Sequence, residues 1–116
     1  MSKNIVLFGA TGSIGSSVLN LLDKTGDEFC LKAITCNQKI DSLLEISNKY
    51  KCNNLGVSDT NILEETNGIF LNKNIVFGIE NFEEFINDDI DIYILAISGL
   101  SSANLALKIA ETGKTL

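Results

Sequence analysis

The amino-acid sequence predicts an α/β fold in which a doubly wound, mainly parallel sheet carries helices on both faces. Short apolar runs alternate along the chain with segments whose apolar residues recur at helical spacing. Two of the runs, residues 4–8 and 90–97, are apolar almost throughout, as expected of central strands that are buried on both faces. Alternation of strand and helix implies parallel pairing through right-handed crossovers.

Each element follows from its local pattern. Five segments carry the short apolar pattern of strands: residues 4–8, 29–35, 54–57, 75–77 and 90–97. Four segments have apolar residues at helical spacing: residues 13–25, 40–50, 81–87 and 105–110. Gly26 and Gly113 stand just past the first and last of these helices, where glycine is favoured. Residues 58–73 are polar and rich in asparagine, with one weak helical turn at 62–65.

The length of the chain fits one domain. A chain of 116 residues can bury a single core but is small for a complete two-substrate enzyme. Residues 114–116 have the pattern of an entry to a further strand. We therefore expect residues 1–116 to be a truncated N-terminal domain whose sheet is incomplete at its C-terminal side.

Composition excludes several classes of function. The net charge of −6 argues against a nucleic-acid partner, because such binding needs a basic surface. No apolar run approaches the ~20 residues that span a bilayer, and the first run is too short for a signal peptide. We expect no membrane partner and a cytoplasmic location. Histidine is absent and the three cysteines lack zinc-binding spacing, which excludes Ser-His and Cys-His nucleophilic pairs.

A GATGSIG segment that begins at Gly9 joins the first predicted strand to the first predicted helix. Gly9 lets the chain turn sharply, Gly12 lets backbone approach a pyrophosphate, and Gly15 lets the helix pack on the sheet. The phosphates would meet free N–H groups at the helix start, with further bonds from the Thr11 and Ser13 hydroxyls. This context predicts a Rossmann-like dinucleotide-binding unit, and a purely structural glycine turn is the alternative.

The end of the second predicted strand favours a phosphorylated coenzyme. NAD-selective domains usually carry an acid there, about 20 residues after the glycines, to bind the ribose 2′-hydroxyl. This segment has no acid before Asp41. Asn37 and Gln38 instead offer amide donors, and Lys39 offers positive charge, to a 2′-phosphate. As a group these residues favour NADP, whereas each alone fits a solvated loop before a helix equally well.

Two other segments have competing interpretations. Residues 98–102 follow the last predicted strand, where they either border the coenzyme or form an ordinary helix start with a serine cap. Asp88, Asp89 and Asp91 precede the same strand. The ligand edge of a parallel sheet lies at the carboxyl ends of its strands, so these acids fit a solvated turn better than a metal cluster.

The GATGSIG segment resembles the G-[SA]-T-G-S-I-G signature that opens 1-deoxy-D-xylulose 5-phosphate reductoisomerases. Four other stretches agree with that family in order and spacing: residues 29–35, 89–91, 96–99 and 113–116. The resemblance covers the whole chain but only the family's N-terminal cofactor domain. Its catalytic and C-terminal domains are absent from this chain.

The resemblance implies NADPH as reductant and a sugar phosphate as substrate. The full-length enzyme converts 1-deoxy-D-xylulose 5-phosphate to 2-C-methyl-D-erythritol 4-phosphate in non-mevalonate isoprenoid biosynthesis, with Mg or Mn and as a homodimer. The resemblance places four residues along the pyrophosphate: Thr11, Gly12, Ser13 and Ile14. It places three at the adenosine 2′-phosphate, where family members often have Gly-[RK]-Asn: Asn37, Gln38 and Lys39.

The family's Asn-Lys-Glu motif would begin just beyond Leu116, with its metal-binding and substrate-phosphate residues further on. We therefore assign no catalytic and no metal-binding residue and expect this chain alone to be inactive. Two alternatives stay open. One is another GxxGxxG NADP-dependent reductase, of the aspartate-semialdehyde dehydrogenase type or an atypical short-chain reductase, and the other is a non-catalytic dinucleotide sensor.

Overall fold

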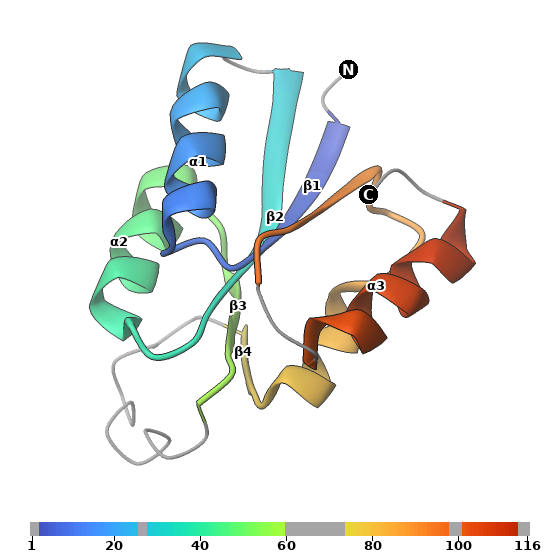
Figure 1. Ribbon diagram of the computed structural model, residues 1–116. Helices are drawn as coiled ribbons and strands as arrows, with labels where there is room; N and C mark the ends of the chain where they lie inside the picture. The colour runs from blue at the N-terminus through green and yellow to red at the C-terminus, as the bar shows by residue number, and fades with distance from the viewer. Residues whose placement is uncertain (1–2, 26–27, 60–73, 98–100, 114–116) are drawn as a thin grey trace.

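The computed structural model describes residues 3–25, 28–59, 74–97 and 101–113, without the side chains of residues 101, 102 and 104. These residues form a five-stranded sheet with flanking helices (Figure 1). The strands are β1 (Lys3–Phe8), β2 (Phe29–Cys36), β3 (Asn54–Val57), β4 (Asn74–Phe77) and β5 (Ile92–Leu95). The helices are α1 (Ser13–Thr25), α2 (Ile40–Tyr50), the 3₁₀ helix η4 (Ile79–Phe85) and α3 (Ser101–Thr112).

The strand order β4-β3-β2-β1-β5 places the start of the chain near the middle of the sheet. From β1 the chain moves outward through β2 and β3 to β4, and then crosses back to the other side of β1 as β5. All four strand pairs are parallel, as predicted. The reversal of direction beside β1 creates the kind of switch point where open α/β sheets bind ligands.

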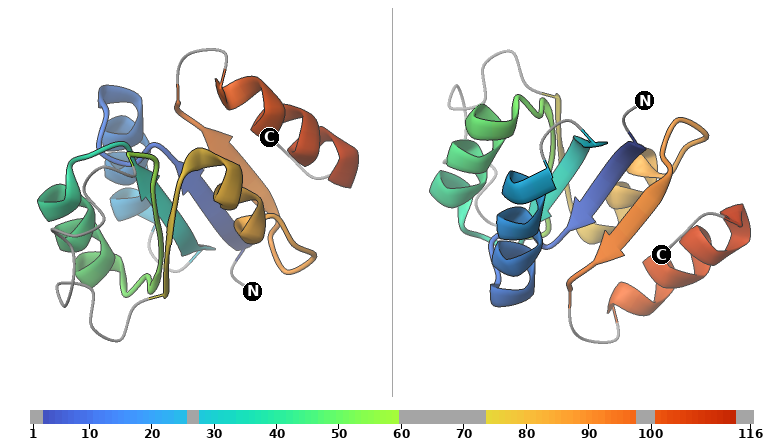
Figure 2. Two further views of the ribbon diagram at one scale, coloured as in Figure 1. Left: turned by 90° about the horizontal axis from the view of Figure 1, so that it is seen from below. Right: turned by 90° about the horizontal axis from the view of Figure 1, so that it is seen from above.

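Helices cover both faces of the sheet, with α1 and α2 on one face and η4 and α3 on the other (Figure 2). Because successive side chains of a strand point to opposite faces, β1 contributes to both cores. Ile5 and Leu7 pack with the α1 and α2 side, whereas Val6 and Phe8 pack with the η4 and α3 side. All four side chains are buried, which explains why β1 is apolar from Ile5 to Phe8.

The helix expected over residues 81–87 is a 3₁₀ helix that begins at Ile79. A 3₁₀ helix has three residues per turn, so Ile79, Phe82 and Phe85 share one face. The last two are buried, and the Phe82 ring stacks on Phe8 with 6.1 Å between centroids. The predicted short helix is therefore confirmed, and the spacing of these three side chains suits its tighter 3₁₀ form.

Other boundaries differ from expectation by a few residues. Strand β5 is shorter than the predicted 90–97, because its ladder with β1 ends at Leu95, opposite Phe8. Helix α3 begins at Ser101 and continues through residues 105–110, in agreement with the helix start that was one interpretation of this segment. The remaining strands and the helices α1 and α2 are confirmed. Four segments with sequence-based predictions lie outside the described residues: Gly26, most of 58–73, 98–100 and 114–116.

Within the described residues, no helix combines the length and apolar character that crossing a membrane would require. Cys30, Cys36 and Cys52 form no disulfide bond with one another, and the last two are buried.

Gly15 should be essential for seating α1 on the sheet. A Cβ on Gly15 would overlap the Gly9 carbonyl oxygen and lie 2.7 Å from the Ala10 carbonyl carbon. We expect Gly15→Ala to lower the free energy of unfolding by about 1–3 kcal/mol, as measured by urea denaturation. Gly12→Ala is the matched control, because its Cβ would meet no atom within 4 Å, and its effect should stay within about 0.5 kcal/mol. Equal unfolding midpoints for the two variants would contradict this packing role.

Candidate dinucleotide-binding site

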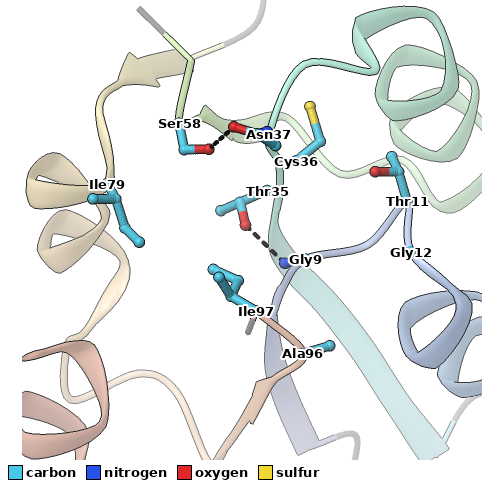
Figure 3. Close-up of a pocket in the computed structure, with 10 residues that line it drawn as sticks. All are labelled: Gly9, Thr11, Gly12, Thr35, Cys36, Asn37, Ser58, Ile79, Ala96 and Ile97. Carbon is cyan, nitrogen blue, oxygen red and sulfur yellow. Dashed lines mark hydrogen bonds between the residues drawn. The ribbon is translucent and has the colours of Figure 1, made fainter. Parts of the chain in front are cut away.

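A cleft of about 500 Å³ opens where the carboxyl ends of the strands meet (Figure 3). Its size lies within the usual range for small-molecule sites. The lining comes from the segments that follow the strands: Gly9, Thr11, Gly12, Thr35, Cys36, Asn37, Ser58, Ile79, Ala96 and Ile97. This is the edge of the sheet at which the sequence predicted a coenzyme.

The turn after β1 is compatible only with glycine at its first position. Gly9 has a φ of 90°, a conformation that residues with a Cβ rarely adopt. A Cβ there would also lie 2.8 Å from the carbonyl oxygen of Ala96, at the end of β5. Gly15 is buried beneath the same turn and has no room for a side chain. The roles predicted for Gly9 and Gly15 are therefore confirmed.

Gly12 differs from these two glycines because the space around it is open. It is exposed, its φ is not positive, and an added Cβ would meet nothing within 4 Å. It immediately precedes α1, whose first turn contains no acidic residue. The helix N-terminus carries partial positive charge, so this position offers an anion both space and favourable electrostatics.

Thr35 holds the glycine turn and was missed by the sequence analysis as a site residue. Its hydroxyl oxygen accepts a hydrogen bond from the Gly9 N–H at 2.8 Å, and its carbonyl oxygen accepts one from the Ala10 N–H at 2.7 Å. The side chain is fully buried. The sequence feature that could have identified Thr35 was a hydroxyl residue at the carboxyl end of a largely apolar strand.

The ends of β2 and β3 are joined by three hydrogen bonds. The Ser58 N–H donates to the Cys36 carbonyl at 2.9 Å, and the Asp59 N–H donates to the Asn37 carbonyl at 3.0 Å. The Ser58 hydroxyl donates to the Asn37 side-chain oxygen at 2.6 Å. Ser58 is a second cleft residue that sequence reasoning missed, because nothing in its local pattern separates it from the polar segment that follows.

The structure brings three of the seven predicted coenzyme residues into the lining of the cleft: Thr11, Gly12 and Asn37. Ser13 and Ile14 lie exposed in the first turn of α1. Gln38 and Lys39 are exposed just before α2 and do not line the cleft. Lys39 is the N-cap residue of α2 and makes no capping hydrogen bond through its side chain.

Cys36, in the cleft lining, and Tyr50, on α2, are titratable side chains that do not provide a nucleophile or an acid–base group. Burial raises the pKa of the Cys36 thiol to about 11, so it is neutral and unreactive at pH 7. Burial, together with a 2.5 Å hydrogen bond to Asp23, raises the pKa of Tyr50 to about 12. The same bond lowers the pKa of Asp23. Tyr50 and Asp23 thus link α2 to α1.

The acids before β5 lie at the amino ends of the strands, as predicted. The Asp91 carboxylate accepts a hydrogen bond from the Asn4 N–H at 2.8 Å, and the Asp89 carbonyl accepts one from the Asn4 side chain at 2.8 Å. These contacts secure a turn at the start of β1, on the opposite edge from the cleft. Across the described residues no three potential ligands gather into a metal site.

Comparison with known proteins decides the family. The family model for 1-deoxy-D-xylulose 5-phosphate reductoisomerase matches residues 5–116. The chain belongs to this family. The reductoisomerase of Ruthia magnifica subsp. Calyptogena magnifica is 32% identical over 116 residues, which cover 98% of this chain and 30% of that protein. The Pelagibacter ubique enzyme is 31% identical over 120 residues, with the same two coverages.

Solved structures of reductoisomerases share the fold. The Zymomonas mobilis enzyme in complex with NADPH has a TM-score of 0.88 at 22% identity, over 98% of this chain and 31% of that one. A reductoisomerase in complex with NADPH, fosmidomycin and magnesium has a TM-score of 0.84 at 25% identity, over 97% of this chain and 28% of that one. The chain thus spans about 30% of the length of the curated relatives that it matches. Family membership favours a reductoisomerase over the other reductases and the sensor.

Thr35 should control the order of the glycine turn. We expect Thr35→Val to leave the Gly9 N–H without its acceptor and to lower the free energy of unfolding by about 1–3 kcal/mol. The Gly9 amide should also exchange its hydrogen faster, as measured by NMR. Thr35→Ser is the control, because it keeps the acceptor oxygen and should keep Gly9 protected. Equal Gly9 exchange in the two variants would show that the hydroxyl does not hold the turn.

Proposed function

We propose that residues 1–116 form the NADPH-binding N-terminal domain of a 1-deoxy-D-xylulose 5-phosphate reductoisomerase. The whole enzyme would convert 1-deoxy-D-xylulose 5-phosphate to 2-C-methyl-D-erythritol 4-phosphate in non-mevalonate isoprenoid biosynthesis. One observation carries the proposal: in a chain of this family, a GATGSIG turn directs the N-terminus of α1 toward a 500 Å³ cleft at the carboxyl edge of a parallel sheet.

The pyrophosphate of NADPH is proposed to lie against four residues of the glycine turn and the first turn of α1: Thr11, Gly12, Ser13 and Ile14. The residues present fit this group. The open space at Gly12 is what a backbone needs to approach a phosphate closely, and the first turn of α1 has no carboxylate to repel it. The hydroxyls of Thr11 and Ser13 add donors beside the backbone N–H groups.

The adenosine 2′-phosphate is proposed to lie at the end of β2, facing Asn37, Gln38 and Lys39. Asn37 lines the cleft, and no acid stands at this position to favour a free 2′-hydroxyl. The Lys39 side chain makes no capping bond to the N-terminus of α2, and its positive charge stands beside Asp41, the acid in the first turn of that helix. The NADPH found in related solved structures supports the same coenzyme here.

When bound, NADPH supplies the hydride for the reductive step. The residues of this chain bind and orient it: the glycine turn holds the pyrophosphate, and Ile79, Ala96 and Ile97 give the cleft an apolar wall that excludes water. We assign no catalytic or metal-binding residue to the chain. The Mg or Mn ion, the sugar phosphate, the homodimer interface and the cytoplasmic location belong to the proposal for the full-length enzyme, whose relatives extend well beyond the matched segment.

Gly12→Val should abolish NADPH binding while preserving the fold. The added side chain would fill the space in which backbone meets the pyrophosphate, yet it would meet no protein atom near its Cβ. Calorimetric titration with NADPH measures the loss, and circular dichroism with urea denaturation checks the fold. Leu21→Val is the control, since Leu21 is exposed on α1 away from the cleft and its replacement should leave affinity unchanged. Wild-type affinity in a folded Gly12→Val variant would refute the pyrophosphate assignment.

The chain should bind NADPH more tightly than NADH, and Lys39→Asp should reverse part of this preference. A hydrogen bond to a charged group contributes about 1.5–3 kcal/mol, so we expect the ratio of dissociation constants to shift by about tenfold or more. Lys24→Asp makes the same change of charge in the last turn of α1 and should leave the ratio unchanged. An unaltered ratio in Lys39→Asp would mean that another residue holds the 2′-phosphate.

A further inference from the structure

The side chains of Asn37 and Ser58 meet at the rim of the cleft, although 21 residues separate them in the sequence. Figure 3 shows the Asn37 side-chain oxygen turned toward the Ser58 hydroxyl, which donates to it at 2.6 Å. The backbone bonds from Ser58 to Cys36 and from Asp59 to Asn37 fix both residues in place. The side-chain hydrogen bond therefore joins two residues whose backbones are already fixed by hydrogen bonds.

This bond determines which end of the Asn37 carboxamide is available to a ligand. A carboxamide has one acceptor oxygen and one nitrogen with two N–H donors. Because the oxygen faces Ser58, the nitrogen is left to bind elsewhere, and no described residue accepts a hydrogen bond from it. Asn37 is exposed and lines the cleft, so these two donors are accessible from solvent.

The two forms of the coenzyme respond differently to this orientation. A 2′-phosphate has only acceptor oxygens at neutral pH, so it bonds to the nitrogen of Asn37 and is repelled by its oxygen. A 2′-hydroxyl is both donor and acceptor, so it can bond to either end of the carboxamide. Fixing the nitrogen toward the ribose therefore favours NADPH and leaves NADH nearly unaffected.

We propose that Ser58 is a positioning residue for coenzyme selection, whose hydroxyl holds the Asn37 carboxamide with its N–H donors toward the adenosine 2′-phosphate. This inference rests on the proposed function, because it requires NADPH to bind with its adenosine ribose at the end of β2. It adds to that function a residue just after β3 that does not itself need to touch the coenzyme.

The test compares Ser58→Ala with Ser58→Thr in the 116-residue chain, by calorimetric titration with NADPH and with NADH. Ser58→Ala frees the carboxamide to rotate, and we expect it to weaken NADPH binding by about fivefold. Its affinity for NADH should stay within about twofold of wild type. Ser58→Thr keeps the hydroxyl and should retain the wild-type ratio of the two dissociation constants.

A second variant tests whether Ser58 acts on the coenzyme through Asn37. Asn37→Asp keeps the shape of the side chain and the acceptor for Ser58 but replaces both N–H donors by a carboxylate oxygen whose negative charge also repels the 2′-phosphate, and it should weaken NADPH binding more than Ser58→Ala does. Once those donors are gone the Ser58 hydroxyl has nothing left to orient, so adding Ser58→Ala to Asn37→Asp should cause no further change in the coenzyme ratio.

The outcomes separate this inference from the proposed function. If wild type binds neither coenzyme, both fail. If wild type prefers NADPH and Ser58→Ala leaves the ratio unchanged, or weakens both coenzymes equally, the positioning role is wrong and the proposed function stands. A loss confined to NADPH, with recovery in Ser58→Thr, supports the positioning role.

Discussion

The contact between Gly9 and the two strand ends beside it is the constraint on which the rest of the site depends. The Gly9 N–H is bonded to the Thr35 hydroxyl, and its α-carbon lies against the Ala96 carbonyl at a distance that leaves no room for a Cβ. The turn is thereby held between β2 and β5. This placement fixes where α1 begins, and Gly15 then seats that helix directly on the turn.

In the proposed function the chain would attract an anion locally although its overall charge is −6. At physiological ionic strength charges are screened over about 8 Å, so the groups within the cleft matter more than the sum over the surface. The first turn of α1 has no acid, and none of the described residues that line the cleft carries a carboxylate. In the proposed function, backbone N–H groups, hydroxyls and one carboxamide would perform the role that arginine and histidine, both missing from this chain, play in many phosphate sites.

The end of β2 shows how a short segment acquires several functions. Thr35 is buried and holds the glycine turn, Cys36 is buried with a raised thiol pKa, and Asn37 reaches the cleft. Residues 37–39 also depart from the Gly-[RK]-Asn pattern common in the family: Gln38 stands at the position of the basic residue, Lys39 carries the positive charge one residue later, and Asn37 replaces the glycine with an amide. Such a replacement helps to bind a phosphate only if the amide turns its N–H donors toward that phosphate. This is the physical reason that Ser58, just after the neighbouring strand β3, matters to the proposed site.

Local sequence patterns were sufficient for the alternation of strands and helices, the glycine turn and the absence of a nucleophilic pair, because each depends on residue type and short spacing. They left the type of η4 open, since the same apolar spacing fits an α-helix and a 3₁₀ helix until Phe82 meets Phe8. Only the tertiary structure paired Gly9 with Thr35 and Ser58 with Asn37, which lie 26 and 21 residues apart. Those contacts follow from strand order and register, which arise from packing the whole sheet and are not encoded in any local run of residues.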